Sequence, residues 1–187
     1  MINKPDLRKQ LKSLRKQFNL LEITAWNQTL ATQILESAAY HEASSLLGYL
    51  SFGQEASMDL VLQQALADGK IVCVPEILTE TTIQAVQLSD LQAVTVGKYG
   101  IRTPLSSTRI VCASTLDLVL VPGLGFSKEG KRLGMGAGYY DRFLPQVPPA
   151  QIVGVCYQAQ ICDNIPVNEN DVKMAYLVTE QGWIVCS

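Results

Sequence analysis

The first residues of the chain carry apolar side chains that recur every three or four positions. Across 7–18 the apolar residues are separated by four, three and four positions, which is the pattern of one face of an α-helix. Asn3 can cap this helix, and Pro5 is tolerated in its first turn. The pattern therefore predicts a helix over 4–17, and similar apolar spacing predicts a second helix over 24–39.

Beyond the second predicted helix, the pattern changes to short apolar runs separated by helical or turn segments. Strands over 46–52 and 70–77 flank a helix over 57–69, and together they form a β-α-β unit. Runs of mixed polar and apolar residues within 82–96 predict short strands or a hairpin. An irregular connection through 97–107 follows.

The second half of the chain repeats this alternation. It predicts a helix around 139–144 and further strands over 116–123, 151–158, 175–180 and 182–187. Continuously apolar strands indicate burial on both faces, and hence a mostly parallel sheet with helices on each side. We expect one α/β domain over 1–187, a three-layer α/β/α sandwich with a mostly parallel, mixed-edge central sheet. Residues 1–40 would form an N-terminal helical arm packed on the core.

Composition and charge exclude some classes of function. The chain has 187 residues, of which 48% are hydrophobic, and a net charge of −2, so the total charge gives no support for general attraction to nucleic acid or membranes. No apolar run reaches the roughly 18 to 20 residues of a membrane span, and the first residues lack the apolar centre of a secretion signal. We expect a cytoplasmic monomer with no nucleic-acid or membrane partner.

Cysteine and histidine are too sparse to suggest the common catalytic and metal sites. The five cysteines are scattered singly without a C-x-x-C pair, which is typical of buried thiols in a reducing compartment. The single histidine, His41, lies at the polar end of a predicted helix and is expected to be solvated or capping. Catalysis by Ser-His-Asp or Cys-His groups would depend on this one residue. The charged groups of a catalytic site should therefore be Lys, Arg, Asp and Glu.

Six glycines fall within 123–138, directly after a predicted buried strand. In α/β sheets, ligands bind beyond the carboxyl ends of the strands. Residues 125–131 read G-x-x-x-x-G-K, but Arg132 follows and has no hydroxyl to offer Mg²⁺, so the P-loop pattern fails. The dinucleotide fingerprint fails as well, because Tyr139 stands where its last glycine should be.

What remains is an alternation of Gly134, Gly136 and Gly138, preceded by Arg132 and followed by a predicted helix. Alternating glycines let successive N–H groups turn toward one anion, the helix N-terminus adds a favourable dipole, and Arg132 supplies a bidentate charge. We interpret the segment as a polyphosphate site. The alternative is a tight turn with spare glycines.

The residues around these glycines also resemble a known family. VPGLGFSKEGKRLGMGAGYYD is similar to the signature of 5-formyltetrahydrofolate cyclo-ligase, also called 5,10-methenyltetrahydrofolate synthetase. Three other segments agree in order and spacing: K-x-x-L-R at 4–8, Y-L-S followed by Glu55, and PVNENDVK, which contains Asp171. The resemblance therefore covers nearly the whole chain.

This resemblance implies an activity. The family closes 5-formyltetrahydrofolate to 5,10-methenyltetrahydrofolate with ATP and Mg²⁺ and releases ADP and phosphate. The expected mechanism is attack of the formyl oxygen on the γ-phosphate, which gives an imidate phosphate. The neighbouring folate nitrogen then displaces phosphate and closes the ring. Phosphoryl transfer of this kind asks the protein mainly for positioning and positive charge.

The resemblance also implies roles for individual residues. Arg132, Lys4 and Tyr140 would act in catalysis, and Asp141 and Asp171 would hold Mg²⁺. ATP would contact Lys4, Pro5, Asp6, Leu7, Arg8, Arg132, Leu133, Gly134, Met135, Gly136, Ala137, Gly138, Tyr139 and Tyr140. The folate would contact Arg8, Leu50, Glu55, Met135, Gly136, Ala137, Gly138 and Tyr139. Glu55 would accept paired hydrogen bonds from the pterin edge.

Other interpretations of these segments stay open. Without the resemblance, the arm is a solvated basic face or a nucleic-acid-binding arm, because its other cations are Lys9, Lys12, Arg15 and Lys16. The resemblance changes that interpretation for Lys4 and Arg8 only. Glu55 is equally interpreted as an acid at a helix N-terminus. Thr103 stands where relatives more often carry an acid, so no carboxylate role is assumed there. An α/β protein acting on a sugar phosphate or acyl carrier, and a non-catalytic nucleotide- or RNA-binding module, are the alternative functions.

Overall fold

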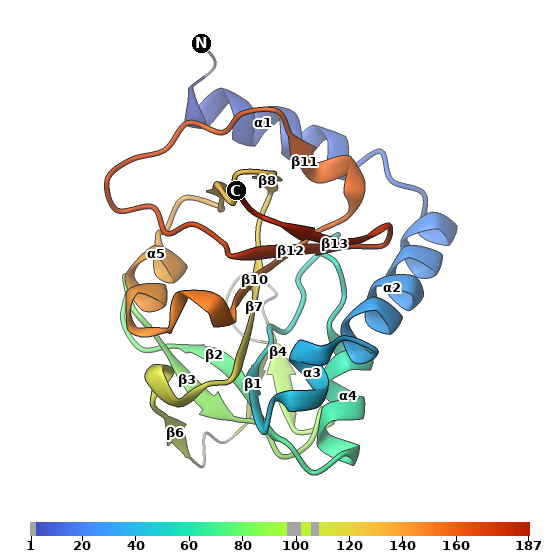
Figure 1. The fold of residues 1–187 in the computed structure, drawn as a ribbon, viewed down its shortest axis with the longest axis vertical. Helices are drawn as coiled ribbons and strands as arrows, with labels where there is room; N and C mark the ends of the chain where they lie inside the picture. Colours follow the sequence, from blue (N-terminus) through green and yellow to red (C-terminus); the bar gives the residue numbers. More distant parts are fainter. Residues whose placement is uncertain (1–2, 97–101, 106–108) are drawn as a thin grey trace.

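A central β-sheet runs through the protein in the computed structural model, which describes residues 3–96, 102–105 and 109–187 (Figure 1). The eight strands are, in spatial order, β13 (Gly182–Val185), β12 (Tyr176–Thr179), β10 (Ile152–Val155), β7 (Leu118–Pro122), β1 (Ser45–Leu47), β2 (Ile71–Ile77), β3 (Ile83–Gln87) and β6 (Ile110–Val111). The strands from β12 to β2 are parallel, whereas β13 and β3 are antiparallel to their neighbours. The predicted mostly parallel sheet with mixed edges is confirmed.

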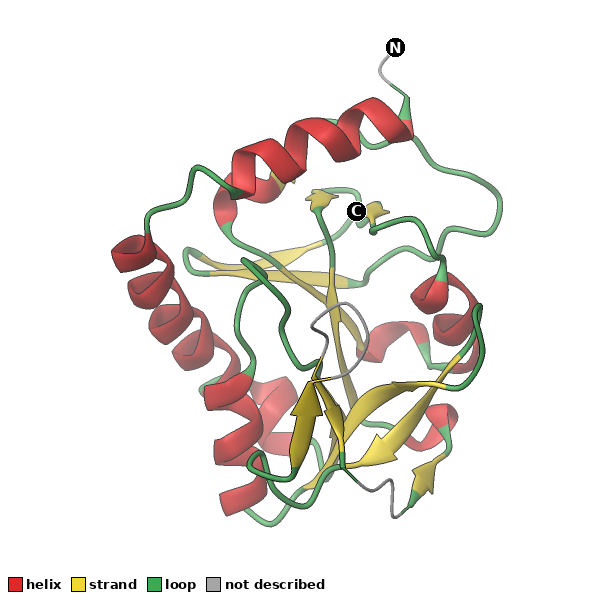
Figure 2. Cartoon of the chain, turned by 180° about the vertical axis from the view of Figure 1, so that it is seen from behind, coloured by secondary structure: helices red, strands yellow, loops and turns green. Residues whose placement is uncertain are grey.

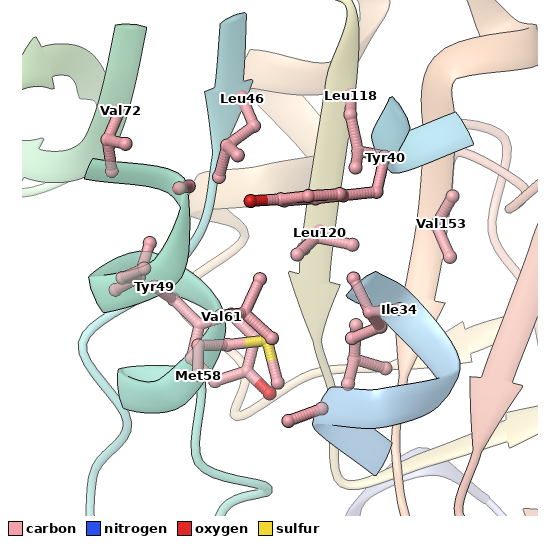
Figure 3. Close-up of a cluster of buried hydrophobic side chains, with 14 of the residues drawn as sticks. Ile34, Tyr40, Leu46, Tyr49, Met58, Val61, Val72, Leu118, Leu120 and Val153 are labelled. Atoms are coloured by element: carbon pink, nitrogen blue, oxygen red, sulfur yellow. The ribbon is translucent and has the colours of Figure 1, made fainter. Parts of the chain in front are cut away.

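Both faces of the sheet are covered, because alternate residues of the central strands point to opposite sides. On one face, Leu118 and Leu120 pack with α2 (Leu20–Leu35), α3 (Ala38–Glu42) and α4 (Asp59–Ala67), as Figure 3 shows. On the other face, Val119 and Val121 pack with residues of α5 (Tyr139–Phe143) and of two short 3₁₀ turns, η2 (Ala113–Thr115) and η3 (Leu144–Gln146). A further 3₁₀ turn, η4 (Pro149–Gln151), precedes β10. The second layer is thus thinner than the predicted full helical layer.

The N-terminal arm differs from the prediction in the extent of its second helix. The first helix, α1 (Lys4–Arg15), is capped by Asn3, whose side chain accepts a hydrogen bond from the Asp6 N–H at 2.9 Å, as predicted. The second helix was predicted over 24–39, which is wrong at both ends. A capping box between Asn19 and Glu22 starts α2 at Leu20, and Ser37 caps the separate helix α3.

Two small sheets and a long loop complete the described part of the chain. In the first small sheet, β4 (Val94–Val96) pairs with β5 (Arg102–Pro104). The second small sheet consists of β11 (Ile161–Cys162), β8 (Gly125–Ser127) and β9 (Arg132–Leu133). The 3₁₀ turn η5 (Gln158–Gln160) directly precedes β11. The predicted irregular connection over 97–107 lies largely outside the described residues. The predicted strand 46–52 ends early, because the chain leaves β1 after Leu47 and forms a loop over 48–58.

Several single-residue expectations can be compared with the structure. Cys73 and Cys156 are buried as predicted, but Cys112 is exposed, so that part of the prediction is wrong. His41 is exposed in the last turn of α3. Across residues 3–96, 102–105 and 109–187, no helix has both the length and the apolar character needed to cross a membrane.

Candidate active site

Helix α1 lies across loops at the carboxyl edge of the parallel strands, as Figures 1 and 2 show. Its buried residues Leu7 and Leu11 pack against Leu124, Leu133 and Ile165. This apolar contact holds the N-terminal helix against the chain that follows β7. The first residues of the protein therefore share one edge of the sheet with the glycine-rich segment.

The glycine loop (134–138) links β9 to α5 and faces α1. The Arg8 Nε donates a hydrogen bond to the Gly134 carbonyl oxygen at 3.0 Å. Gly136 and Gly138 have φ angles of +116° and +70°, in the region that side-chain-bearing residues rarely adopt. Gly138 caps α5, so the predicted helix start after the glycines is confirmed. Beyond these two positions, Gly130 shapes the turn between β8 and β9, with a φ of +79°.

The buried side chain of Arg132 lies directly behind the glycine loop, with its guanidinium next to Gly134. The residue is only 7% exposed, and its Nη2 donates to the Asp141 Oδ1 at 2.6 Å. Its guanidinium carbon lies 5.5 Å from the centroid of the Tyr140 ring. Its Nε is buried with no hydrogen-bond partner among the described residues. The guanidinium therefore has one charged partner and one unused donor.

Lys4 and Asp171 form a second ion pair of the same kind. The Lys4 Nζ lies 2.5 Å from the Asp171 Oδ2, and each side chain is 15% exposed. The same carboxylate oxygen accepts a hydrogen bond from the Asn168 N–H at 2.6 Å. Each carboxylate predicted to hold Mg²⁺ is thus paired with a cation predicted to meet phosphate. In the part of the chain that the structure describes, no group of three or more metal-ligating side chains comes together.

Glu55 lies in the loop after β1, with its carboxylate turned back over its own turn. The Phe52 N–H donates to the Glu55 Oε2 at 3.0 Å, and the Glu55 N–H donates to the Phe52 carbonyl at 3.2 Å. Burial raises the pKa of the Glu55 carboxyl, whereas the Phe52 N–H and the positive charge of Arg15 lower it. The predicted helix-terminal alternative is wrong, because α4 begins at Asp59.

Tyr140 brings the glycine-loop side of the site into electrostatic reach of Glu55. Burial raises the pKa of the Tyr140 hydroxyl, the Glu55 charge raises it further, and Arg132 opposes the shift. The hydroxyl is buried with no hydrogen-bond partner within the described ranges. The phenol therefore stays protonated and has an unused donor at neutral pH.

The remaining predicted site residues fall into two groups. Leu7, Leu50 and Leu133 are buried. The side chains of Leu7 and Leu133 pack in the apolar cluster beneath α1, so a ligand could contact these two residues mainly through their backbone atoms. Exposed positions are Pro5, Asp6, Met135, Gly136 and Ala137, while Tyr139 is half-buried. The structure thus brings Lys4, Arg8 and the glycine loop to one edge.

Arg15 is the residue that the sequence interpretation placed wrongly. It was grouped with the solvated lysines of the arm, but only 5% of it is exposed. Its Nε donates to the Gln54 carbonyl at 3.1 Å. A signal was present, since Arg15 follows Arg8 by seven residues and Leu11 by four, and these spacings share one helix face.

The fold and the sequence of this chain both match known proteins. The solved structure of Aquifex aeolicus 5,10-methenyltetrahydrofolate synthetase matches with a TM-score of 0.86 and 26% identity, over 97% of this chain and 92% of that one. Residues 1–180 match the model of the 5-formyltetrahydrofolate cyclo-ligase family. The chain therefore belongs to this family and is an enzyme of the cyclo-ligase class.

Two relatives extend the match over nearly the full chain. A Caenorhabditis elegans protein named "Probable 5-formyltetrahydrofolate cyclo-ligase" is 31% identical over 97% of this chain and 95% of its own length. The 5-formyltetrahydrofolate cyclo-ligase of Mus musculus is 28% identical over 96% of this chain and 94% of its own length. The resemblance seen in the sequence is thereby confirmed at the level of the family.

Proposed function

We propose that the protein closes 5-formyltetrahydrofolate to 5,10-methenyltetrahydrofolate and couples the reaction to hydrolysis of ATP to ADP and phosphate. The observation that carries the proposal is the meeting of α1 with the glycine loop, where Arg8 contacts Gly134 from 126 residues away in sequence. Family membership favours this function over the sugar-phosphate and nucleic-acid alternatives. A single domain over 1–187 that acts in the cytoplasm as a monomer remains part of the proposal.

The phosphates of ATP would bind between α1 and the glycine loop. Lys4 and Arg8 lie one turn apart on α1, and Arg132 stands behind the loop with its Nε unpartnered among the described residues. Positive charge and loop N–H groups are what phosphoryl transfer requires of a protein. In the structure, Lys4 is paired with Asp171 and Arg132 with Asp141. ATP would therefore compete with Asp171 and Asp141 for these cations.

Asp141 and Asp171 are the residues that would hold Mg²⁺. Both are hard oxygen ligands and both are partly accessible. With only two such carboxylates, the remaining ligands would be water and phosphate, which suits Mg²⁺. The metal would supply positive charge against the phosphates. Release of the two carboxylates from Lys4 and Arg132 would accompany its binding.

The folate would lie on the Glu55 side of the same edge. An ionised Glu55 can accept two hydrogen bonds from the N–C–N edge of a pterin. Leu50 and Tyr139 would provide apolar surface beside it. The formyl oxygen would attack the γ-phosphate while the bond to ADP breaks. The neighbouring folate nitrogen would then attack the formyl carbon, and phosphate would leave with the original formyl oxygen.

The test is turnover of a labelled substrate. The protein is incubated with ATP, MgCl₂ and 5-formyltetrahydrofolate carrying ¹⁸O in the formyl group, and methenyl absorbance, ADP and ¹⁸O in phosphate are measured. We expect one ADP per methenyl product and the label in phosphate. Absence of ATP-dependent product from folded protein would refute the function. Product formation with unlabelled phosphate would refute only the phosphorylated intermediate.

A further inference from the structure

Arg15 is a buried cation that has no role in the function proposed above. It is the last residue of α1 and 5% exposed, whereas Lys12 and Lys16 on either side of it are exposed. One of its terminal nitrogens, Nη1, is buried without a hydrogen-bond partner within the described part of the chain. A guanidinium cannot escape burial by losing its proton. Its environment must therefore compensate the charge.

The contact that Arg15 makes is with the turn that carries Glu55. Its Nε donates to the carbonyl of Gln54 at 3.1 Å, one residue before Glu55. That turn (52–55) is closed by the two hydrogen bonds between Phe52 and Glu55. Arg15 thus ties the end of α1 to the turn, and the Glu55 carboxylate points back over the same turn.

Charge is the second link between Arg15 and Glu55. Glu55 is the carboxylate whose charge acts most strongly on Arg15, and the other groups acting on Arg15 are the hydroxyls of Tyr49 and Tyr157. The ionisable groups that interact electrostatically with Glu55 are Arg15 on α1, the Tyr49 hydroxyl in the same loop as Glu55, and the Tyr140 hydroxyl on α5. Both hydroxyls are neutral, because burial raises the pKa of each. Arg15 is therefore the positive charge that offsets the burial of the carboxylate.

We propose that Arg15 is a positioning residue for folate binding, which fixes the 52–55 turn and thereby the direction in which the Glu55 carboxylate faces the pterin. This inference rests on the proposed function. It adds a residue from the end of the N-terminal helix to the folate side of the site. The N-terminal helix would then serve both substrates, the nucleotide through its first turns and the folate through its last residue.

The experiment compares Arg15→Gln and Arg15→Lys with Lys12→Gln, which removes the same charge from an exposed position of the same helix. Steady-state kinetics are measured for each substrate as a function of pH. The titration of the Glu55 carboxyl is followed separately by ¹³C NMR in protein without substrates. The NMR titration does not depend on turnover.

We expect Arg15→Gln to raise KM for the folate about tenfold, the effect of losing one charge-assisted interaction, with KM for ATP changed less than about twofold. Loss of the positive charge raises the pKa of Glu55, so the acid limb of kcat/KM for the folate should move to higher pH. The NMR titration should move in the same direction. Arg15→Lys should restore both titrations while keeping part of the KM defect, and Lys12→Gln should match the wild type.

Two outcomes would overturn the inference. If Arg15→Gln raises both KM values equally and leaves the Glu55 titration unmoved, Arg15 only holds the fold together. If Lys12→Gln produces the same shifts, the effect comes from the charge of the helix and not from Arg15. Failure of the wild type to form product would instead refute the proposed function, and a shifted Glu55 titration would still show the coupling of the two side chains.

Discussion

The two edges of the parallel sheet differ in how their polar groups are used. At the amino edge, where β7, β10 and β12 begin, a cavity of about 840 Å³ opens beside Asp117, Glu36 and Trp183. There the Asp117 Oδ2 accepts hydrogen bonds from the Ser44 N–H at 3.0 Å and the Ser45 N–H at 2.9 Å. The carboxylate thus ties the start of β1 to that of β7.

The carboxyl edge holds buried donors that no other described protein group uses. Arg132 and Tyr140 each carry a buried donor without a partner among the described residues. Buried polar groups left unpaired cost roughly 1–3 kcal/mol each. A protein keeps such groups where a ligand uses them. At the amino-edge cavity the buried atom without a partner among the described residues is an acceptor, Gln151 Oε1. Unused donors beside two ion pairs therefore distinguish the carboxyl edge as the candidate site for an anionic ligand.

Replacement of Arg132 should have the largest effect on activity, because this cation lies behind the glycine loop. Arg132→Ala removes a cation from the wall of the glycine loop and leaves Asp141 without its partner at 2.6 Å. We expect kcat/KM for ATP to fall about a hundredfold or more, as when one preorganised charge donor is lost. Arg132→Lys should retain part of the activity, because it keeps the charge but not the fork. Unchanged use of ATP by Arg132→Ala would remove this residue from the site.

Replacement of Glu55 should separate stability from function. Glu55→Gln is expected to raise KM for the folate about tenfold, the value of one charge-assisted pair, with little change for ATP. Because burial raises the pKa of Glu55 in the folded protein, ionisation costs stability as the pH rises through that raised pKa. The variant should therefore be at least as stable as the wild type at neutral pH, and this advantage should vanish below the ordinary Glu pKa of 4.5.

Thermal unfolding of both proteins, below the ordinary Glu pKa of 4.5 and at neutral pH, measures this difference. Equal effects on the two KM values would make Glu55 structural. Greater stability of the wild type at neutral pH would mean that the hydrogen bond from Phe52 outweighs the cost of burying the charge.

Two tyrosines with buried hydroxyls differ in whether the hydroxyl has a hydrogen-bond partner. The Tyr140 hydroxyl has no partner among the described residues, whereas the Tyr49 hydroxyl donates to the Ala56 carbonyl at 2.8 Å. Tyr140→Phe should leave the free energy of unfolding within about 0.5 kcal/mol of the wild type, but lower kcat several-fold. Tyr49→Phe should cost about 1–2 kcal/mol, because it strands a buried carbonyl. Urea unfolding and kinetics of both variants test this, and a stability loss in Tyr140→Phe with normal kcat would reverse the assignment.

Sequence pattern captured the sheet because continuous apolar runs leave few other ways to bury both faces. The hydrophobic pattern did not predict the ends of elements that are set by a few polar residues or by a turn of the chain. The capping box at Asn19 and Glu22 sets the start of α2. The chain leaves β1 after Leu47, so most of the predicted strand 46–52 belongs instead to the loop that carries Glu55.

The candidate site was predictable only in part. Local motifs placed Arg132 beside the glycine loop, but the contact between Lys4 and Asp171 joins residues 167 positions apart, which periodicity cannot reveal. Arg15 was misplaced because charged residues are seldom buried, although its spacing from Leu11 places it on the buried face of α1. The ligand contacts themselves remain predictions.

The smallest expected effect on activity belongs to the amino edge, and it completes the comparison. Asp117→Asn keeps an oxygen near the Ser44 and Ser45 N–H groups but removes the negative charge that strengthens those bonds. We expect a loss of about 1 kcal/mol in the free energy of unfolding, because the bonds become neutral ones. KM for either substrate and kcat should stay at the wild-type values, since the residue lies at the opposite edge from the glycine loop. Chemical unfolding and steady-state kinetics of the same preparation measure both quantities. A variant of unchanged stability and impaired turnover would show that the amino-edge cavity takes part in the reaction, and the distinction between the two edges would then fail.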